Sequence, residues 1–173
     1  MGSTEMLTII FTQAVVTLFA IMLAYVKLKQ EIQKSRREKV YELRLDRLKR
    51  QLSEFYGPLH MLCTSTTDIA KTAWGTDIWE RVWKEIILPA QQQIEGILLS
   101  KIDLLDESEI PQSYFDFLKH FKVNKSYRDT GWGVSYFEKG TFYPASFNQD
   151  VLNAYQKKRQ QYVELLQSVE LYA

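Results

Sequence analysis

The two histidines and the single cysteine are the side chains of this chain best suited to catalysis. His60 and Cys63 are three residues apart, a spacing at which two side chains meet on one face of a helix. Such a pair could act as a base and a thiol nucleophile, but no third group that would orient the imidazole is visible. His120 belongs to a different predicted helix. We expect both histidines to be partly buried with polar partners, and we predict no catalytic residue and no enzymatic activity.

An acidic segment at 103–110 is the other candidate for chemistry, because its carboxylates could hold a cation. Its carboxylates are Asp103, Asp106, Glu107 and Glu109. The segment lacks the pattern of oxygen ligands and glycine that a calcium loop requires, so a solvated connector explains it better. The chain has no glycine-rich phosphate loop, no nucleophile elbow and no zinc-type histidine pair. We therefore predict no metal site and no cofactor.

The charges divide the chain into three zones. Residues 1–26 carry one charged side chain, Glu5, residues 27–51 carry ten basic and four acidic residues, and residues 52–173 have a net charge of −4. Apolar residues make up 46% of the chain and aromatic residues 13%, which allows a packed core and excludes wholesale disorder. The basic cluster adjoins an apolar segment and the rest of the chain is acidic, so we expect no nucleic-acid partner.

The apolar zone has the length of a membrane span. Met6–Val26 comprises 21 residues without a charge, and at 1.5 Å per residue this helix would measure about 31 Å. A cleaved signal peptide or a buried helix are the alternatives, but the segment lacks a basic start and small residues before a cleavage point. The basic residues follow the segment, so the positive-inside rule places the N-terminus outside and residues 27–173 in the cytoplasm. We predict a single-pass protein of the inner membrane, with the lipid bilayer as its first partner.

One face of the predicted span gathers small and polar side chains. These are Gln13, Thr17, Ala20 and Ala24. Small residues let helices approach closely in a membrane, and an amide can donate hydrogen bonds across a helix pair. This face predicts association of spans into a homo-oligomer, although threonine and alanine are also common in spans that do not associate.

Residues 27–56 predict a charged helical stalk, because they contain strong helix formers and neither proline nor glycine. An apolar stalk seam follows the spacing 4, 3, 4, 3 that is typical of a heptad. Its members are Tyr41, Leu45, Leu48, Leu52 and Phe55. The seam covers only about two heptads. It can pack onto the rest of the cytosolic domain or, less well, onto a second copy.

Residues 57–173 predict a compact cytosolic domain. Gly57 and Pro58 are expected to end the stalk, with glycine in a left-handed stop and proline starting the next helix. A second helix should end near Gly75, a third is interrupted by Pro89, and further helices follow from Pro111 and Asn148. The fold class is therefore all-α: a single N-terminal transmembrane helix (1–26), the stalk (27–56), and a bundle of four to five helices that includes the stalk.

An aromatic loop at 127–147 interrupts the helical pattern with three glycines and a proline. Its candidate interaction residues are Trp132, Tyr136, Phe137, Phe142 and Tyr143. Long loops within compact domains often carry function, and aromatic side chains favour interfaces. The alternative is that these rings cover the open end of the bundle.

The stretch 52–59, Leu-Ser-Glu-Phe-Tyr-Gly-Pro-Leu, resembles an LSEFYxPL motif of uncharacterised bacterial membrane-anchored helical proteins. The resemblance extends to a tryptophan-containing helix interrupted by proline (83–89) and to an aromatic helix that starts with Ile110-Pro111. It would cover most of 27–166. It implies an inner-membrane-anchored helical protein and transfers no catalytic residue.

These observations together predict a scaffold. In this prediction the span localises the chain, the stalk holds the domain away from the bilayer, and the helical module binds a protein partner. The alternative is a membrane effector of the defence or toxin type, in which oligomerised spans perturb the bilayer.

Overall fold

The computed structural model describes residues 2–105, 110–129 and 143–170. Side chains are not described at positions 3–10, 12, 14, 126–129, 169 and 170. Within the described ranges every regular element is a helix and none is a strand, which confirms the all-α prediction. The chain divides into two compact units, Met1–Arg44 and Leu45–Ala173.

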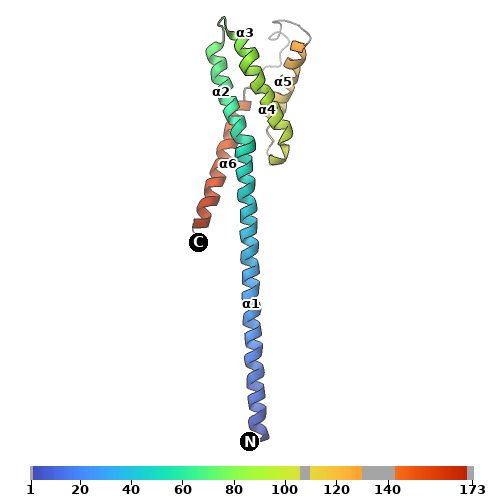
Figure 1. The fold of residues 1–173 in the computed structure, drawn as a ribbon, viewed down its shortest axis with the longest axis vertical. Helices are drawn as coiled ribbons and strands as arrows, with labels where there is room; N and C mark the ends of the chain where they lie inside the picture. The colour runs from blue at the N-terminus through green and yellow to red at the C-terminus, as the bar shows by residue number, and fades with distance from the viewer. Residues whose placement is uncertain (1, 106–109, 130–142, 171–173) are drawn as a thin grey trace. The chain divides into compact units, whose positions relative to one another are not determined.

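The first unit consists of helix α1 alone. The helix runs without interruption over Ser3–Arg50 and so continues into the second unit (Figure 1). Neither proline nor glycine occurs between these bounds, so no residue removes a backbone hydrogen bond or loosens the turn. In the part of the chain that the structure describes, no helix is both long and apolar enough to cross a membrane. Within the predicted span, Met6–Val26, the structure does not describe the side chains at 6–10, 12 and 14.

The second unit is built from short helices. After α1 come the π-helix η1 (Gln51–Tyr56), α2 (Gly57–Ala73), α3 (Trp79–Val82), the π-helix η2 (Trp83–Ile87), α4 (Leu88–Ser100), the 3₁₀ turn η3 (Ile102–Leu104), α5 (Gln112–Asp129) and α6 (Phe147–Glu170). The rod formed by α3, η2 and α4 returns alongside α2, and α5 lies against α4 (Figure 1). The last helix, α6, contacts both η1 and α2.

The predicted stop at Gly57 is wrong, because the helix continues through Gly57 and Pro58. Gly57 has the right-handed helical angles φ −64° and ψ −54°, and its N–H donates to the carbonyl of Leu52, five residues earlier. Proline lacks an N–H, and its ring presses on the carbonyl four residues back in a regular α-helix. The wider π turn relieves both problems. The same arrangement recurs before Pro89, where the N–H of Leu88 donates to the carbonyl of Trp83.

The chain does turn at Gly75, as predicted. Helix α2 ends at Ala73, and Gly75 adopts a φ of +73°, in the left-handed region that favours glycine. Two contacts follow this turn closely: the N–H of Thr76 donates to the Ala73 carbonyl at 3.1 Å, and the Thr76 hydroxyl donates to the same oxygen at 2.6 Å. The turn reverses the chain and sends α3 back along α2.

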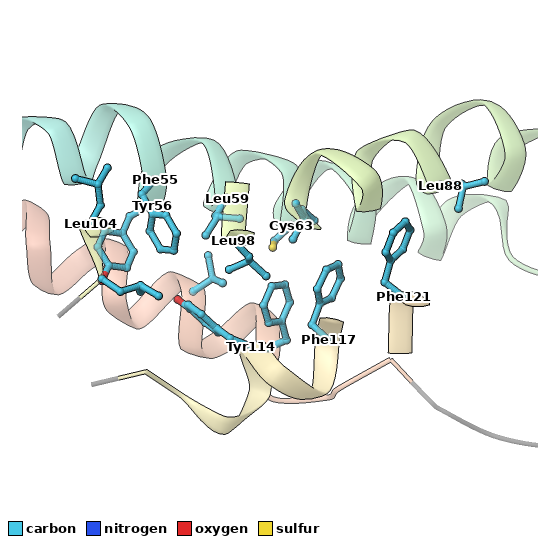
Figure 2. Close-up of a cluster of buried hydrophobic side chains, with 14 residues drawn as sticks. Phe55, Tyr56, Leu59, Cys63, Leu88, Leu98, Leu104, Tyr114, Phe117 and Phe121 are labelled. Atoms are coloured by element: carbon cyan, nitrogen blue, oxygen red, sulfur yellow. The ribbon is translucent and has the colours of Figure 1, made fainter. Parts of the chain in front are cut away.

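The core lies between η1 and α2 on one side and α5 on the other. Figure 2 shows the α5 side chains spread along this core, with Phe117 near Cys63 and Phe121 near Leu88. The buried members of this core are Phe55, Tyr56, Leu59, Cys63, Leu88, Ile94, Leu98, Leu104, Leu105, Tyr114, Phe117, Phe121, Phe147 and Val151. Phe117 is central, since its ring stacks on Phe147 at a centroid distance of 4.4 Å. Rings of this size provide most of the apolar burial in a domain as small as this one.

Candidate functional site

The structure does not arrange His60 and Cys63 as base and nucleophile. Cys63 is buried, and burial raises the pKa of its thiol to about 12, against a weaker opposing hydrogen bond with Tyr143. The His60 ring stacks on Tyr155 at 4.8 Å, and its Nδ1 lies 3.4 Å from the Thr64 hydroxyl. A reactive cysteine is a thiolate in an exposed, electropositive setting. Cys63 is instead a neutral core side chain.

The other two candidates for chemistry are His120 and the acidic segment at 103–110. His120 is buried, and its Nε2 lies 2.9 Å from the side-chain amide of Asn124. Asp103 is exposed, with its carboxylate 4.0 Å from the Arg50 guanidinium. The remaining carboxylates, at 106, 107 and 109, lie outside the described residues. Among the described residues, no group of three or more His, Cys, Asp or Glu could hold a metal ion.

The aromatic loop is described only at its last candidate, Tyr143. Trp132, Tyr136, Phe137 and Phe142 lie outside the described residues. Tyr143 is half-buried and meets the Phe117 ring edge-on at 5.9 Å. Burial raises the pKa of Tyr143 far above its ordinary value, so its phenol stays protonated. This ring therefore packs against the bundle core.

A chain of hydrogen bonds fastens Tyr143 to helix α2. Its hydroxyl donates to Oδ1 of Asn148 at 2.5 Å, and the Asn148 amide donates to the Thr67 hydroxyl at 2.6 Å. Thr67 donates in turn to the backbone carbonyl of Cys63 at 2.7 Å. The expected helix start at Asn148 is off by one residue, because α6 begins at Phe147 and the Asn148 side chain joins this network. Each donor in the chain has an acceptor, which is what a buried polar network requires.

The stalk seam becomes more buried along the chain. Tyr41, Leu45, Leu48 and Leu52 are each partly buried, and Phe55 is fully buried. Leu52 and Phe55 belong to η1, which contacts α6. Polar contacts hold the same segment. Gln51, also buried, donates through Nε2 to the Leu104 carbonyl at 2.7 Å, and the Glu54 carboxylate accepts from Lys101 at 2.8 Å.

The predicted association face of the span lies on an exposed side of α1. Gln13, Thr17, Ala20 and Ala24 are all exposed. The Thr17 hydroxyl donates to the backbone carbonyl of Gln13 at 2.8 Å, so its proton is used within the helix. Association through this face stays a prediction, and any bond that Thr17 makes to a neighbouring helix would have to be as an acceptor.

Around the turn at Gly75 lies a cluster of exposed and half-buried side chains. We name it the tryptophan surface: Trp74, Ile78, Trp79 and Trp83. The Trp74 ring, 59% exposed, lies 4.8 Å from Trp79, which lies 5.8 Å from Trp83. Sequence reasoning did not single out these residues as a surface, because helical spacing does not show what covers an apolar face.

No protein-family model, no curated protein and no solved structure matches this chain. Any function of this chain is therefore inferred from the chemistry of its exposed side chains. Among the described residues of the second unit, the tryptophan surface is the one place where three tryptophan rings adjoin each other.

Proposed function

We propose that this protein is a membrane-anchored adaptor whose helical module binds a protein partner through the tryptophan surface. The observation that carries the proposal is the exposure of Trp74 and Ile78 beside the half-buried rings of Trp79 and Trp83. Tryptophan is the residue most enriched among those that dominate binding energy at protein interfaces. The apolar area that Trp74 and Ile78 expose also costs solvation free energy unless something covers it.

The surface is pre-organised for binding. Trp79 and Trp83 lie one turn apart on the α3–η2 rod, and Trp74 comes from the end of α2 across the Gly75 turn. The backbone N–H of Trp74 donates to the Ala70 carbonyl at 3.0 Å, which holds the last turn of α2 in place. A partner would therefore lose little entropy in ordering these rings, and this favours affinity.

The anchor rests on residues of α1. The uncharged stretch Met6–Val26 is followed by a basic flank, and its described apolar side chains are largely exposed, Phe11, Leu18 and Phe19 among them. The unit Met1–Arg44 contains no second helix that could cover them. Insertion in a bilayer would cover them. The positive-inside rule then gives an outer N-terminus and a cytoplasmic domain, with residues 27–44 as a helical spacer about 27 Å long.

The binding proposal is tested with the double variant Trp74→Ala and Trp79→Ala. Proteins that co-elute in mild detergent are compared with those of the natural chain, and captured amounts of the specific partner should fall about tenfold or more. Phe115→Ala is the matched control, because Phe115 is another half-exposed ring, on α5. Equal capture by all three proteins would refute the proposal. Circular dichroism and thermal melting verify that both variants fold.

The anchor is tested by alkaline carbonate extraction and by protease treatment of intact spheroplasts. We expect the chain to stay with the membrane and its C-terminal part to resist external protease. Recovery in the aqueous fraction would refute the anchor. A membrane-potential dye during overexpression distinguishes the adaptor from a membrane effector, since depolarisation would support the effector.

A further inference from the structure

One line of apolar side chains continues from the apolar segment of α1 past its uncharged end, and the stalk seam does not include it. We name it the dimer seam: Leu18, Ile21, Tyr25, Leu28 and Ile32. The spacing of its members is 3, 4, 3, 4, and their side chains are between 45% and 67% exposed. This spacing places the first, third and fifth members at heptad position a and the other two at d.

The dimer seam extends beyond the part of the helix that lipid would cover. Val26 is the last residue of the uncharged stretch, and Ile32 lies about 9 Å further along the helix axis. Charged residues surround Leu28 and Ile32, with Lys27, Lys29 and Glu31 adjacent. Burial in the hydrocarbon layer explains Leu18 to Tyr25 but leaves the exposure of Ile32 unexplained.

The charges beside the seam complement those of an identical helix. In the heptad register of the seam, Glu31 occupies position g and Arg36 the following position e. In a parallel two-stranded coiled coil, g of one helix faces this e of the other. Within the described part of the chain, neither residue makes an ion pair, whereas Lys34–Glu38 and Lys39–Glu42 pair within the helix. The two free charges are therefore positioned to pair between two helices.

The seam also has a defined end. The next a and d positions are occupied by Ser35 and Lys39, which would not form an apolar contact. The seam thus covers two heptads, and one of its ends lies among the basic residues that follow the span.

We propose that a second copy of this chain packs in parallel along the dimer seam, from within the predicted span to Ile32. The parallel arrangement rests on the proposed function, because a shared membrane orientation points both helices the same way. The interface differs from the Gln13, Thr17, Ala20 and Ala24 face, whose centre lies about 90° away around the helix axis. One two-helix contact cannot be centred on both faces.

The proposal is tested by disulfide cross-linking in native membranes. Cys63 is the only cysteine and is buried, so Cys63→Ala provides a cysteine-free background. Leu28→Cys and Ile32→Cys are introduced singly, with Gln30→Cys as the matched control, because Gln30 occupies the outward position f. We expect oxidation to give covalent dimers of the two seam variants at several times the yield of the control. Equal yields, or cross-linking through Ala24→Cys instead, would overturn the proposal.

The register is tested by exchanging the two charges in the Leu28→Cys chain. Glu31→Arg and Arg36→Glu each place like charges opposite one another, so each should reduce the cross-linking yield. The double exchange restores opposite charges and should restore the yield. A double variant that cross-links no better than either single variant would overturn the register and, with it, the parallel dimer.

The same membrane samples test the dimer and the membrane anchor independently. Carbonate extraction is performed on each sample, with a soluble fraction kept for cross-linking. A chain that stays with the membrane but does not cross-link refutes the dimer and leaves the anchor standing. A chain that cross-links through Ile32→Cys in the soluble fraction supports the seam and refutes the anchor.

Discussion

Two stretches of this chain carry apolar side chains at the same heptad spacing, yet one is exposed throughout and the other becomes buried toward its end. The dimer seam, Leu18 to Ile32, is at least 45% exposed at every position. The stalk seam ends at Phe55, which is 0% exposed. Periodicity therefore identifies an apolar face of a helix, but it does not identify what covers that face.

The two seams differ in exposure because later segments of the chain pack against the end of the stalk seam. Helix α6 contacts η1, and Leu104 accepts a hydrogen bond from Gln51, so the end of the stalk seam is held by segments roughly 50 to 100 residues away. The unit Met1–Arg44 has no such returning helix. The side chains of its dimer seam are exposed.

The largest effect that would test this comparison is expected for Phe55→Ala. Removing a fully buried phenylalanine leaves a cavity and should lower the free energy of unfolding by about 3–5 kcal/mol. Leu28→Ala is the counterpart on the dimer seam, and it should change the domain's free energy of unfolding by less than about 0.5 kcal/mol. Chemical denaturation followed by tryptophan fluorescence measures both. Similar losses for the two variants would remove the distinction between the seams.

Several elements of the fold were predictable from the sequence. The all-α fold follows from a 48-residue helix free of proline and glycine and from apolar side chains at helical spacing in later segments. The end of α2 near Gly75 was predicted, whereas the left-handed stop that the glycine rule predicted fell at Gly57, where the helix continues. The core rings Tyr114, Phe117 and Phe121 recur at intervals of three and four and are buried as that spacing requires.

The π turns before Pro58 and Pro89 could not be predicted. Locally, proline indicates the start of a helix, because its ring conflicts with the preceding turn. Whether the chain breaks or widens depends on the packing on either side. Here residues before and after Pro58, namely Phe55 and Leu59, are both fully buried in one core, so an uninterrupted helix keeps both in contact. The exposure of the tryptophan surface likewise depends on the direction in which the Gly75 turn sends α3.

An intermediate effect is expected for Gly57→Ala. A Cβ at this position would lie 2.4 Å from the Leu52 carbonyl oxygen, which is a backbone atom and cannot move without changing η1. The free energy of unfolding should fall by about 1–3 kcal/mol. Gly96→Ala on α4 is the matched control, because no atom lies within 4 Å of its added Cβ.

In the control, alanine should stabilise the helix by up to about 1 kcal/mol. Thermal or urea unfolding measures both variants. If Gly57→Ala lowers the free energy of unfolding while Gly96→Ala raises it, the stalk seam requires the π turn. If Gly57→Ala stabilises the domain as Gly96→Ala does, then η1 tolerates a regular α-helical turn.

The smallest effect is expected for Glu54→Gln, which tests the polar part of the same junction. Hydrogen bonds from Lys101 and then from Arg50 hold the pKa of Glu54 below its usual 4.5, against weak desolvation. A lowered pKa means that the stabilising contribution is present above about pH 4.5 and is lost as the pH falls through the lower, folded-state value. The natural chain should therefore lose more thermal stability than the variant between about pH 6 and pH 3.

Glu80→Gln provides the comparison for that measurement. The pKa of Glu80 is also lowered, by a hydrogen bond from Lys84 at 2.7 Å, but this pair lies within one helical turn and both side chains are largely exposed. Glu54 and Lys101 are separated by 47 residues, so their contact joins η1 to the end of α4. A pair that joins two elements opposes unfolding of the domain, whereas a pair within one turn supports only that turn. Melting temperatures measured against pH should thus depend more on Glu54 than on Glu80, and equal dependence would mean that burial alone holds the stalk seam in place.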